Sequence, residues 1–164
     1  MSGVNSIVRD VAPKSVFESA KNVIGSSTSF NQGDLLFLDT TNHLLKPAAL
    51  ESDSANFMGV AVVTVVNGKI ASPYNTDVVA SQSVQDVKGP VVGVIAKCVL
   101  KTGDSISPGQ LVGLYPTLSP RGVSVTVTTS AIGIYQGPAI ASAAAGTEIE
   151  VYIGKALIAG STVS

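Results

Sequence analysis

One phrase of sequence occurs twice in this chain of 164 residues. The first copy, GDLLFLD, begins at Gly33, and the second, GQLVGLY, begins at Gly109. Each copy is followed by a second apolar stretch with a glycine at its centre, FMGVA at 57–61 and AIGIY at 131–135. Repeated strand-turn-strand units of this kind build small β-domains, and none of their residues performs chemistry. The repeat therefore indicates a structural or binding module before it indicates an enzyme.

The composition favours strands. Apolar residues make up 45% of the chain, yet tryptophan is absent and aromatic residues are only 5%. The core must therefore consist of valine, isoleucine, leucine and alanine, and β-branched side chains pack well on a pleated surface. We expect an all-β fold, a compact β-barrel or sandwich, with an extended or partly helical N-terminal arm.

Glycine, proline and asparagine divide residues 32–158 into short strands. Leu35–Leu38 is a short apolar run, and Val91–Leu100 is a second strand candidate. Met58–Val66 is longer and almost continuously apolar, which predicts one strand buried on both faces. Many short strands separated by turn residues are typical of a sandwich or a barrel.

Turn and alternation signals refine this prediction. Asn67-Gly68 is the strongest hairpin signal in the chain and predicts a direct reversal. The polar residues 39–43 predict another turn. Apolar and polar residues alternate over 123–128 and over 148–153, so each segment is expected to have one covered face and one polar face.

Residues 1–31 differ from the β-domain at 32–158, and residues 159–164 form a short C-terminal tail. The N-terminal segment is polar and rich in serine, with too few apolar residues for a core. Within Pro13–Ile24 the apolar residues fall at helical spacing, so a short helix and an extended arm both remain open. The segment is expected to order against something else, the alternative being a chain end without a role.

A charge-free stretch runs from Gly122 to Thr147. It contains Gln136, Pro138 and many hydroxyl residues, so it is not the continuous apolar run that a membrane helix needs. We interpret it as a surface hidden by self-association or by a large partner. An ordinary surface rich in serine and threonine is the alternative.

The residues offer no catalytic, cofactor or metal site. His43 is the only histidine and falls in a predicted turn, where it lacks a positioned partner. Cys98 is the only cysteine and falls in a strand pattern, which predicts a small buried core residue. One cysteine and one histidine cannot make a structural zinc site, and no phosphate-binding glycine loop is present. We expect a protein that is not an enzyme.

The net charge and the number of cysteines indicate which partners and which cellular compartment to expect. The net charge is −1, and the ten basic residues are spread along the chain, so neither nucleic acid nor an anionic membrane is an expected partner. No signal peptide is evident, and a single cysteine excludes an internal disulfide framework. These features suit synthesis in a reducing cytoplasm.

A family resemblance rests on the order of several glycine-and-strand phrases. The chain resembles the decoration (cement) proteins of tailed-bacteriophage capsids over roughly residues 29–155. The phrases in order are SFNQGDLLFLD at 29–39, KPA at 46–48, NFMGVA at 56–61, GQLV at 109–112, IGI at 132–134 and GTEIEV at 146–151.

The resemblance implies a β-tulip domain and a homotrimer. Such proteins sit on the outer surface of the expanded capsid, at or near three-fold positions, and hold neighbouring copies of the major capsid protein together. The localisation implied is the virion, after synthesis in the host cytoplasm. N-terminal arms of the family commonly reach over the capsid, and the arm residues expected to contact it here are Val4, Ile7, Val8, Val11, Val16 and Phe17.

Two other functions stay open. One is a tail, fibre or other surface β-module that binds glycans, although such sites usually present exposed aromatic residues and only eight aromatics occur here. The other is a small trimeric β-barrel enzyme, against which the lack of paired acids with a histidine argues.

Overall fold

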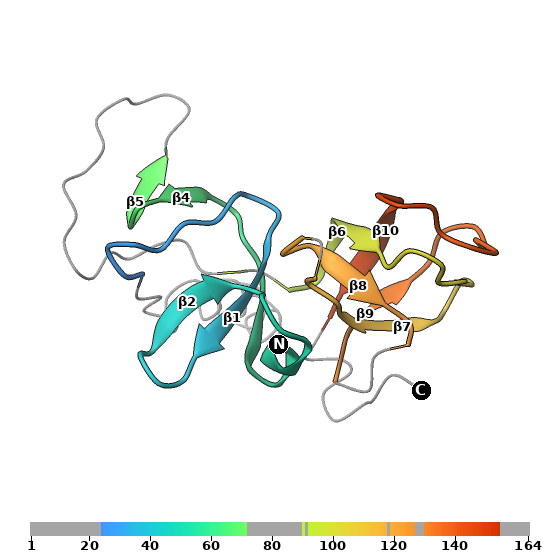
Figure 1. Ribbon diagram of the computed structural model, residues 1–164, viewed down its shortest axis with the longest axis horizontal. Helices are drawn as coiled ribbons and strands as arrows, with labels where there is room; N and C mark the ends of the chain where they lie inside the picture. The colour runs from blue at the N-terminus through green and yellow to red at the C-terminus, as the bar shows by residue number, and fades with distance from the viewer. Residues whose placement is uncertain (1–23, 72–89, 91, 118, 127–129, 155–164) are drawn as a thin grey trace, which may run out of the picture.

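The computed structural model describes residues 24–71, 90, 92–117, 119–126 and 130–154. Within these ranges the regular structure is ten strands and one short 3-10 helix, which confirms the all-β prediction. Figure 1 shows two lobes side by side, which we call the first lobe (residues 24–71) and the second lobe (the described residues of 92–154). The predicted tail at 159–164 and most of the predicted arm lie outside the described residues.

The first lobe contains a three-stranded antiparallel sheet and a hairpin. The sheet has the strand order β2-β1-β3, and β4 pairs with β5. The elements are β1 Leu35–Asp39, β2 Leu44–Pro47, η1 Glu51–Asn56, β3 Phe57–Val60, β4 Thr64–Val66 and β5 Lys69–Ala71.

The two predicted turns of this lobe are present. In the β1–β2 turn the Oδ1 atom of Asp39 accepts a hydrogen bond from the amide of Thr41 at 2.9 Å. In the β4–β5 hairpin Asn67 and Gly68 have φ values of +49° and +72°. Two positive φ values in a two-residue loop match the twist of the flanking strands, which is why this dipeptide forms hairpins so readily.

The prediction of one continuous strand over Met58–Val66 is wrong. β3 ends at Val60 and β4 begins at Thr64. The segment that pairs with these two strands runs from Phe30 into β1. Phe30 exchanges backbone hydrogen bonds with Val65 of β4, and β1 pairs with β3. Between them the segment turns, and the Asp34 amide donates to the carbonyl of Asn31 in that turn. Because the partner segment bends there, no single straight strand can pair along its whole length.

The second lobe is a closed five-stranded barrel with the order β10-β6-β8-β7-β9. Neighbouring strands are antiparallel except β6 and β8, which are parallel. The strands are β6 Val94–Leu100, β7 Leu111–Leu114, β8 Gly122–Ser124, β9 Ala131–Tyr135 and β10 Glu148–Ile153.

The two alternation predictions have different outcomes. In β10 the residues Ile149, Val151 and Ile153 are buried, while Glu148 and Glu150 are exposed, as the pattern predicts. At 123–128 the prediction fails within β8, because Ser124 is as fully buried as Val123. Its hydroxyl donates to the buried carboxylate of Asp104, and a satisfied hydrogen bond allows a polar side chain inside.

The repeated phrase is one strand pair built twice. In the first lobe Leu36 lies opposite Gly59, and the register then shifts so that Phe37 lies opposite Phe57. In the second lobe Val112 lies opposite Gly133, and the register shifts so that Gly113 lies opposite Ala131. In both β3 and β9 the residue just before the glycine has no partner in the register. Both copies therefore carry a β-bulge at the same place. The sheet β2-β1-β3 is thus the counterpart of β8-β7-β9 in the barrel.

The correspondence extends beyond the phrase into the core. The bridge between Phe30 and Val65 has its counterpart in a bridge between Ile106 and Ile140. The first lobe has a small buried core of its own, and each buried residue of that core has a residue at the equivalent position of the second lobe. The pairs are Ile24 and Leu100, Phe30 and Ile106, Leu36 and Val112, Leu45 and Val123, Ala61 and Tyr135, and Val65 and Ile140. Hence both lobes are copies of one structural unit.

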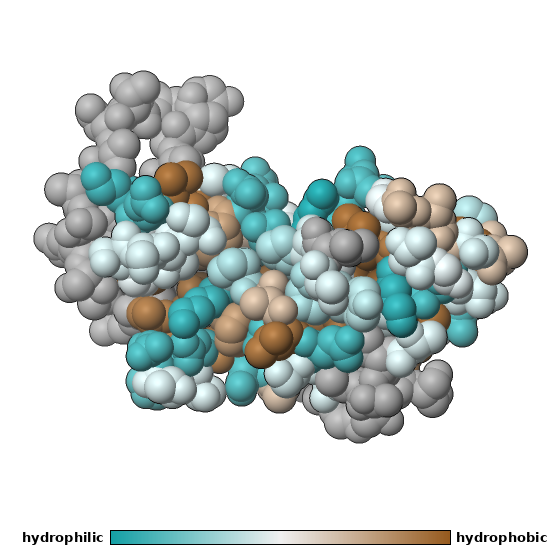
Figure 2. All heavy atoms as spheres, viewed as in Figure 1, coloured by the Kyte–Doolittle hydropathy of each residue, from teal (hydrophilic) through white to brown (hydrophobic). Residues whose placement is uncertain are grey.

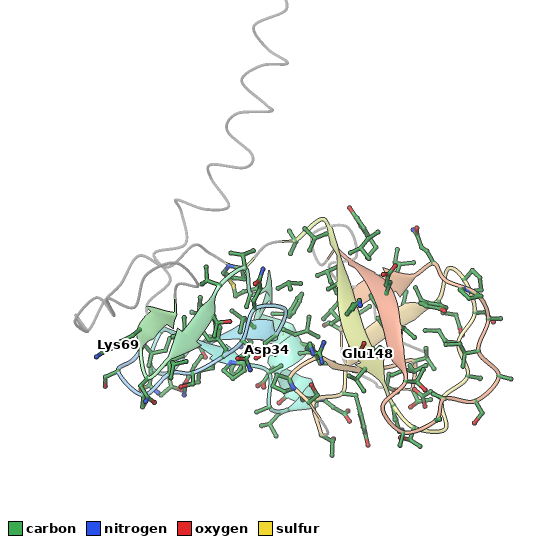
Figure 3. All side chains as sticks on the ribbon, turned by 90° about the horizontal axis from the view of Figure 1, so that it is seen from above. Asp34, Lys69 and Glu148 are labelled. Atoms are coloured by element: carbon green, nitrogen blue, oxygen red, sulfur yellow. The ribbon has the colours of Figure 1, made fainter. Side chains whose placement is uncertain are left out.

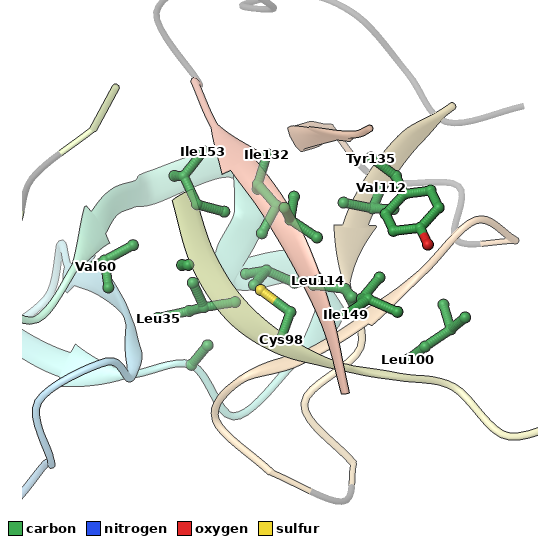
Figure 4. Packing of buried hydrophobic residues seen from close by; sticks show 14 of the residues in the cluster. Leu35, Val60, Cys98, Leu100, Val112, Leu114, Ile132, Tyr135, Ile149 and Ile153 are labelled. Carbon is green, nitrogen blue, oxygen red and sulfur yellow. The ribbon is translucent and has the colours of Figure 1, made fainter. Parts of the chain in front are cut away.

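A larger core joins the two lobes. Leu35, Phe57 and Val60 of the first lobe belong to the same buried cluster as the barrel residues, and Figure 4 shows Leu35 and Val60 beside the barrel strands. The helix η1 contacts both β1 and β7. Part of the predicted arm also belongs to the packed body, since Ile24 and Phe30 are only 1% and 4% exposed.

Candidate interaction surfaces

A groove of about 520 Å³ opens on the first lobe beside β2. Phe37, Pro47 and Leu50 provide its apolar wall. The other lining residues are Ser27, Thr28, Ser29, Lys46, Ala49 and Asp53. The side chain of Leu50 is 63% exposed. We call this surface the Leu50 groove.

The position of Leu50 is fixed by the start of η1. The Oδ2 atom of Asp53 accepts hydrogen bonds from the amides of Ala49 and Leu50 at 2.9 and 2.8 Å. These bonds join the backbone that leads into η1 to the first turn of the helix. Leu50 is therefore presented to solvent by a rigid backbone, so little conformational entropy is lost when a partner covers it.

An ion pair stands at one side of the Leu50 groove. The Nζ atom of Lys46 lies 2.5 Å from the Oδ2 atom of Asp39. The hydrogen bond from Lys46, assisted by the amide of Thr41, holds the pKa of Asp39 well below its usual range. Because Lys46 is already paired, the groove is better suited to an apolar partner than to an anion.

A second apolar surface lies on the outside of the barrel. Ile95 is 68% exposed and lies directly opposite Tyr152 in the β6–β10 pair. A hollow of about 140 Å³ beside them is lined also by Gln136, Gly137 and Glu150. We call this surface the Ile95 patch. Figure 2 shows that apolar areas on the face drawn are small and separated by polar side chains.

The buried carboxylate of Asp104 lies in a hydrogen-bond network of the second lobe. Its Oδ2 atom accepts from the Ser124 hydroxyl at 2.5 Å and from the Val125 amide at 3.1 Å. Thr126 shares a hydrogen bond with Ser124 at 2.9 Å and accepts one from the Nζ atom of Lys101 at 3.0 Å. The network holds the loop of Asp104 against β8.

Cys98 and His43 are the two residues that the sequence analysis considered for catalysis or metal binding. Cys98 is fully buried in the main core, and burial raises the pKa of its thiol to about 12. A thiol in that state is neither a nucleophile nor a metal ligand at neutral pH. His43 is exposed in the β1–β2 turn with a φ of +55°. Within the described ranges, no three residues of the His, Cys, Asp and Glu types are grouped so that they could hold a metal ion.

Charged side chains are dispersed over both lobes. Figure 3 places Lys69 and Glu148 in different lobes, with Asp34 nearer the middle of the molecule. Arg121 pairs with Glu148 at 3.4 Å. In the part of the chain that the structure describes, no helix is long and apolar enough to span a membrane.

The predicted capsid-contact residues Val4, Ile7, Val8, Val11, Val16 and Phe17 lie outside the described residues. Sequence reasoning missed Leu50 and Ile95. Ile95 stands in an unbroken apolar run, where no alternation marks an outward residue, and Leu50 stands between strand signals. A leucine next to the polar stretch ESDSAN is a weak signal of exposure, and only the fold makes it evident.

No protein-family model matches this chain, and no similar sequence was found among curated proteins.

Proposed function

We propose that this chain is a structural virion protein. It binds the outer surface of the expanded capsid of a tailed phage and stabilises the lattice of the major capsid protein. The observation that carries the proposal is the Leu50 groove, in which a rigidly held, exposed leucine lies beside an apolar hollow on an all-β body. An apolar anchor beside a hollow is the arrangement that protein–protein contacts use.

The proposal includes a homotrimer at or near three-fold positions of the capsid. A trimer presents the Leu50 groove three times, so a weak contact gains strength through effective concentration. The Ile95 patch, on the outside of the barrel, is the described surface best suited to the contact between chains. Its mixture of an isoleucine, a tyrosine and polar neighbours is typical of the centre and rim of such contacts.

In this proposal the N-terminal arm supplies a second contact with the capsid. Val4, Ile7, Val8 and Val11 are the residues assigned to it, together with Val16 and Phe17. An extended arm can add a strand to the edge of a neighbouring sheet and gain main-chain hydrogen bonds. Binding restricted to the expanded lattice then stabilises that lattice by mass action.

Co-sedimentation tests the proposal. The purified protein is mixed with expanded capsids assembled without it, and with compact procapsids as the control. We expect saturable binding to the expanded capsids alone. A folded protein that binds neither particle would contradict the proposal.

A glycan-binding tail or fibre module is the second candidate. The hollow beside the Ile95 patch favours it, because Tyr152, Gln136 and Glu150 combine an aromatic face with an amide and a carboxylate. Sugars are bound by such combinations of stacking and hydrogen bonding. A glycan array separates the two functions, since a decoration protein gives no selective signal on it.

A further inference from the structure

Among the described residues, one edge of β2 is free where its counterpart in the barrel has a neighbour. β8 lies between β7 and β6, with Leu100 of β6 opposite Val123 in a parallel pair. β2, the counterpart of β8, has only β1 as a strand neighbour among the described residues. The amide of Ala48 donates to Leu35 of β1, so by alternation the backbone groups of Leu45 point to the other edge.

The residue that leads to this free edge is already in place. Ile24 is 1% exposed and packs in the same cluster as Leu45, as Leu100 packs with Val123 in the barrel. The turn that follows is also matched. The Thr28 amide donates to Gly25 at 2.9 Å, and the Asp104 amide donates to Lys101 at 3.1 Å.

The sequence that ends at Ile24 matches the sequence of β6. Residues 20–24 read AKNVI and residues 96–100 read AKCVL. The alanine, lysine and valine are identical, and isoleucine replaces leucine at the position that is buried in both lobes. Asn22 stands where β6 has the buried Cys98, so the two sequences differ in polarity at that position.

We propose that residues 18–23 of the same chain occupy the free edge of β2 as a parallel strand. The register copies that of β6 on β8, with Val23 opposite Leu44 and Ile24 opposite Leu45. The same chain is the favoured source because Ile24 already packs in the same buried cluster as Leu45, so no long loop has to be closed to reach the edge. The lobes differ at the following residue, where the Gly25 amide donates to the Thr28 hydroxyl at 3.0 Å while the Lys101 amide donates to Val123 at 2.9 Å.

The proposal shortens the arm that can reach a partner. Residues 1–17 remain free for an external contact, and residues 18–23 become part of the first lobe. The proposed strand does not depend on capsid binding, so measurements on the free protein are sufficient to test it.

A cysteine pair tests the position of the strand. The double variant Val23→Cys with Leu44→Cys places two thiols at directly opposite positions, within the Cα separation that a disulfide spans. The native Cys98 is fully buried and does not compete. The control is Ser19→Cys with Leu44→Cys, which separates the thiols by about four residues of strand, or roughly 13 Å.

After mild oxidation we expect a cross-link within one chain for the first pair and none for the control. A cross-linked dimer would assign the strand to a second copy and overturn the proposal. Equal cross-linking of both pairs, or none of either, would also overturn it.

Hydrogen exchange provides a second test that needs no cross-link. In the full chain the amide of Leu45 is expected to exchange at least 100-fold more slowly than the exposed amide of Thr41. Val23→Pro removes a donor from the proposed strand and should accelerate exchange at Leu45 by 10-fold or more, while Val16→Pro should leave it unchanged. Slow exchange at Leu45 in both variants, or fast exchange in the full chain, would contradict the proposal.

Discussion

Gly59 and Gly133 occupy the same place in two copies of one strand pair. Gly59 lies opposite Leu36 and Gly133 opposite Val112, and the register shift follows in both. The reasons for glycine differ. Gly59 has a φ of +134°, which side chains disfavour, whereas a Cβ atom on Gly133 would lie 2.7 Å from the carbonyl oxygen of Tyr152.

The close approach at Gly133 leads to the first prediction. Gly133→Ala places a methyl group 2.5 Å from Cγ1 of Val151 and against backbone that cannot move without opening the β9–β10 pair. We expect the free energy of unfolding to fall by about 3 kcal/mol, as in overpacked cores. Urea denaturation measures it, with the exposed Ala141→Ser as control. A loss below about 0.5 kcal/mol, the usual range of surface substitutions, would contradict the packing described.

The second prediction concerns the buried carboxylate. Ser124→Ala removes the hydroxyl that donates to Asp104 and leaves that carboxylate with one donor fewer inside the protein. We expect a loss of about 1–3 kcal/mol in the free energy of unfolding. The matched control is Ser142→Ala, which changes an exposed serine. Equal stability of the two variants would mean that the network contributes nothing.

The third prediction is a pH dependence that originates at Cys98. Burial raises the pKa of its thiol to about 12 in the fold, whereas in the unfolded chain the thiol ionises near its ordinary pKa of 9.0. The unfolded state therefore releases the proton first, and the free energy of unfolding falls as the pH rises from about 9 towards 12.

Cys98→Ala isolates this effect. The variant should be less stable than the natural protein by about 1 kcal/mol at pH 7, because core contacts are lost. The difference should shrink at pH 10.5, since alanine has no proton to release. A constant difference between the two pH values, measured by urea denaturation, would show that the thiol does not titrate in this way.

The fourth prediction tests the proposed capsid contact. Leu50→Asp puts a charge on an exposed apolar anchor and should weaken binding to expanded capsids at least 10-fold without loss of stability. Ile95→Asp should weaken association between chains first. Co-sedimentation and sedimentation velocity, applied to both variants, distinguish the two surfaces. Unchanged capsid binding by Leu50→Asp would show that the Leu50 groove is not the capsid contact.

The sequence predicts local structure well where one dipeptide or one alternation decides it. Asn67-Gly68 forms its hairpin because the two positive φ values are intrinsic to those residues. The alternation at 148–153 succeeds because one face of β10 is covered by the barrel core. The repeated phrase correctly marks two equivalent strand pairs.

Features that depend on distant contacts could not be predicted. The break after Val60 follows from the bend in the partner segment, and the burial of Ser124 follows from Asp104, twenty residues earlier. The full extent of the repeat also stays hidden in the sequence. Ala61 and Tyr135 are counterparts in position but differ in size, so only their shared hydrogen-bonding pattern reveals it.

The measurement that tests the central claim most directly is the temperature at which expanded, DNA-filled capsids release their DNA, with and without this protein bound. We expect the release temperature to rise with added protein and to reach a plateau when the binding sites are filled. A much smaller rise is expected for Leu50→Asp at the same concentration. An unchanged release temperature on capsids that demonstrably carry the protein would contradict a stabilising role.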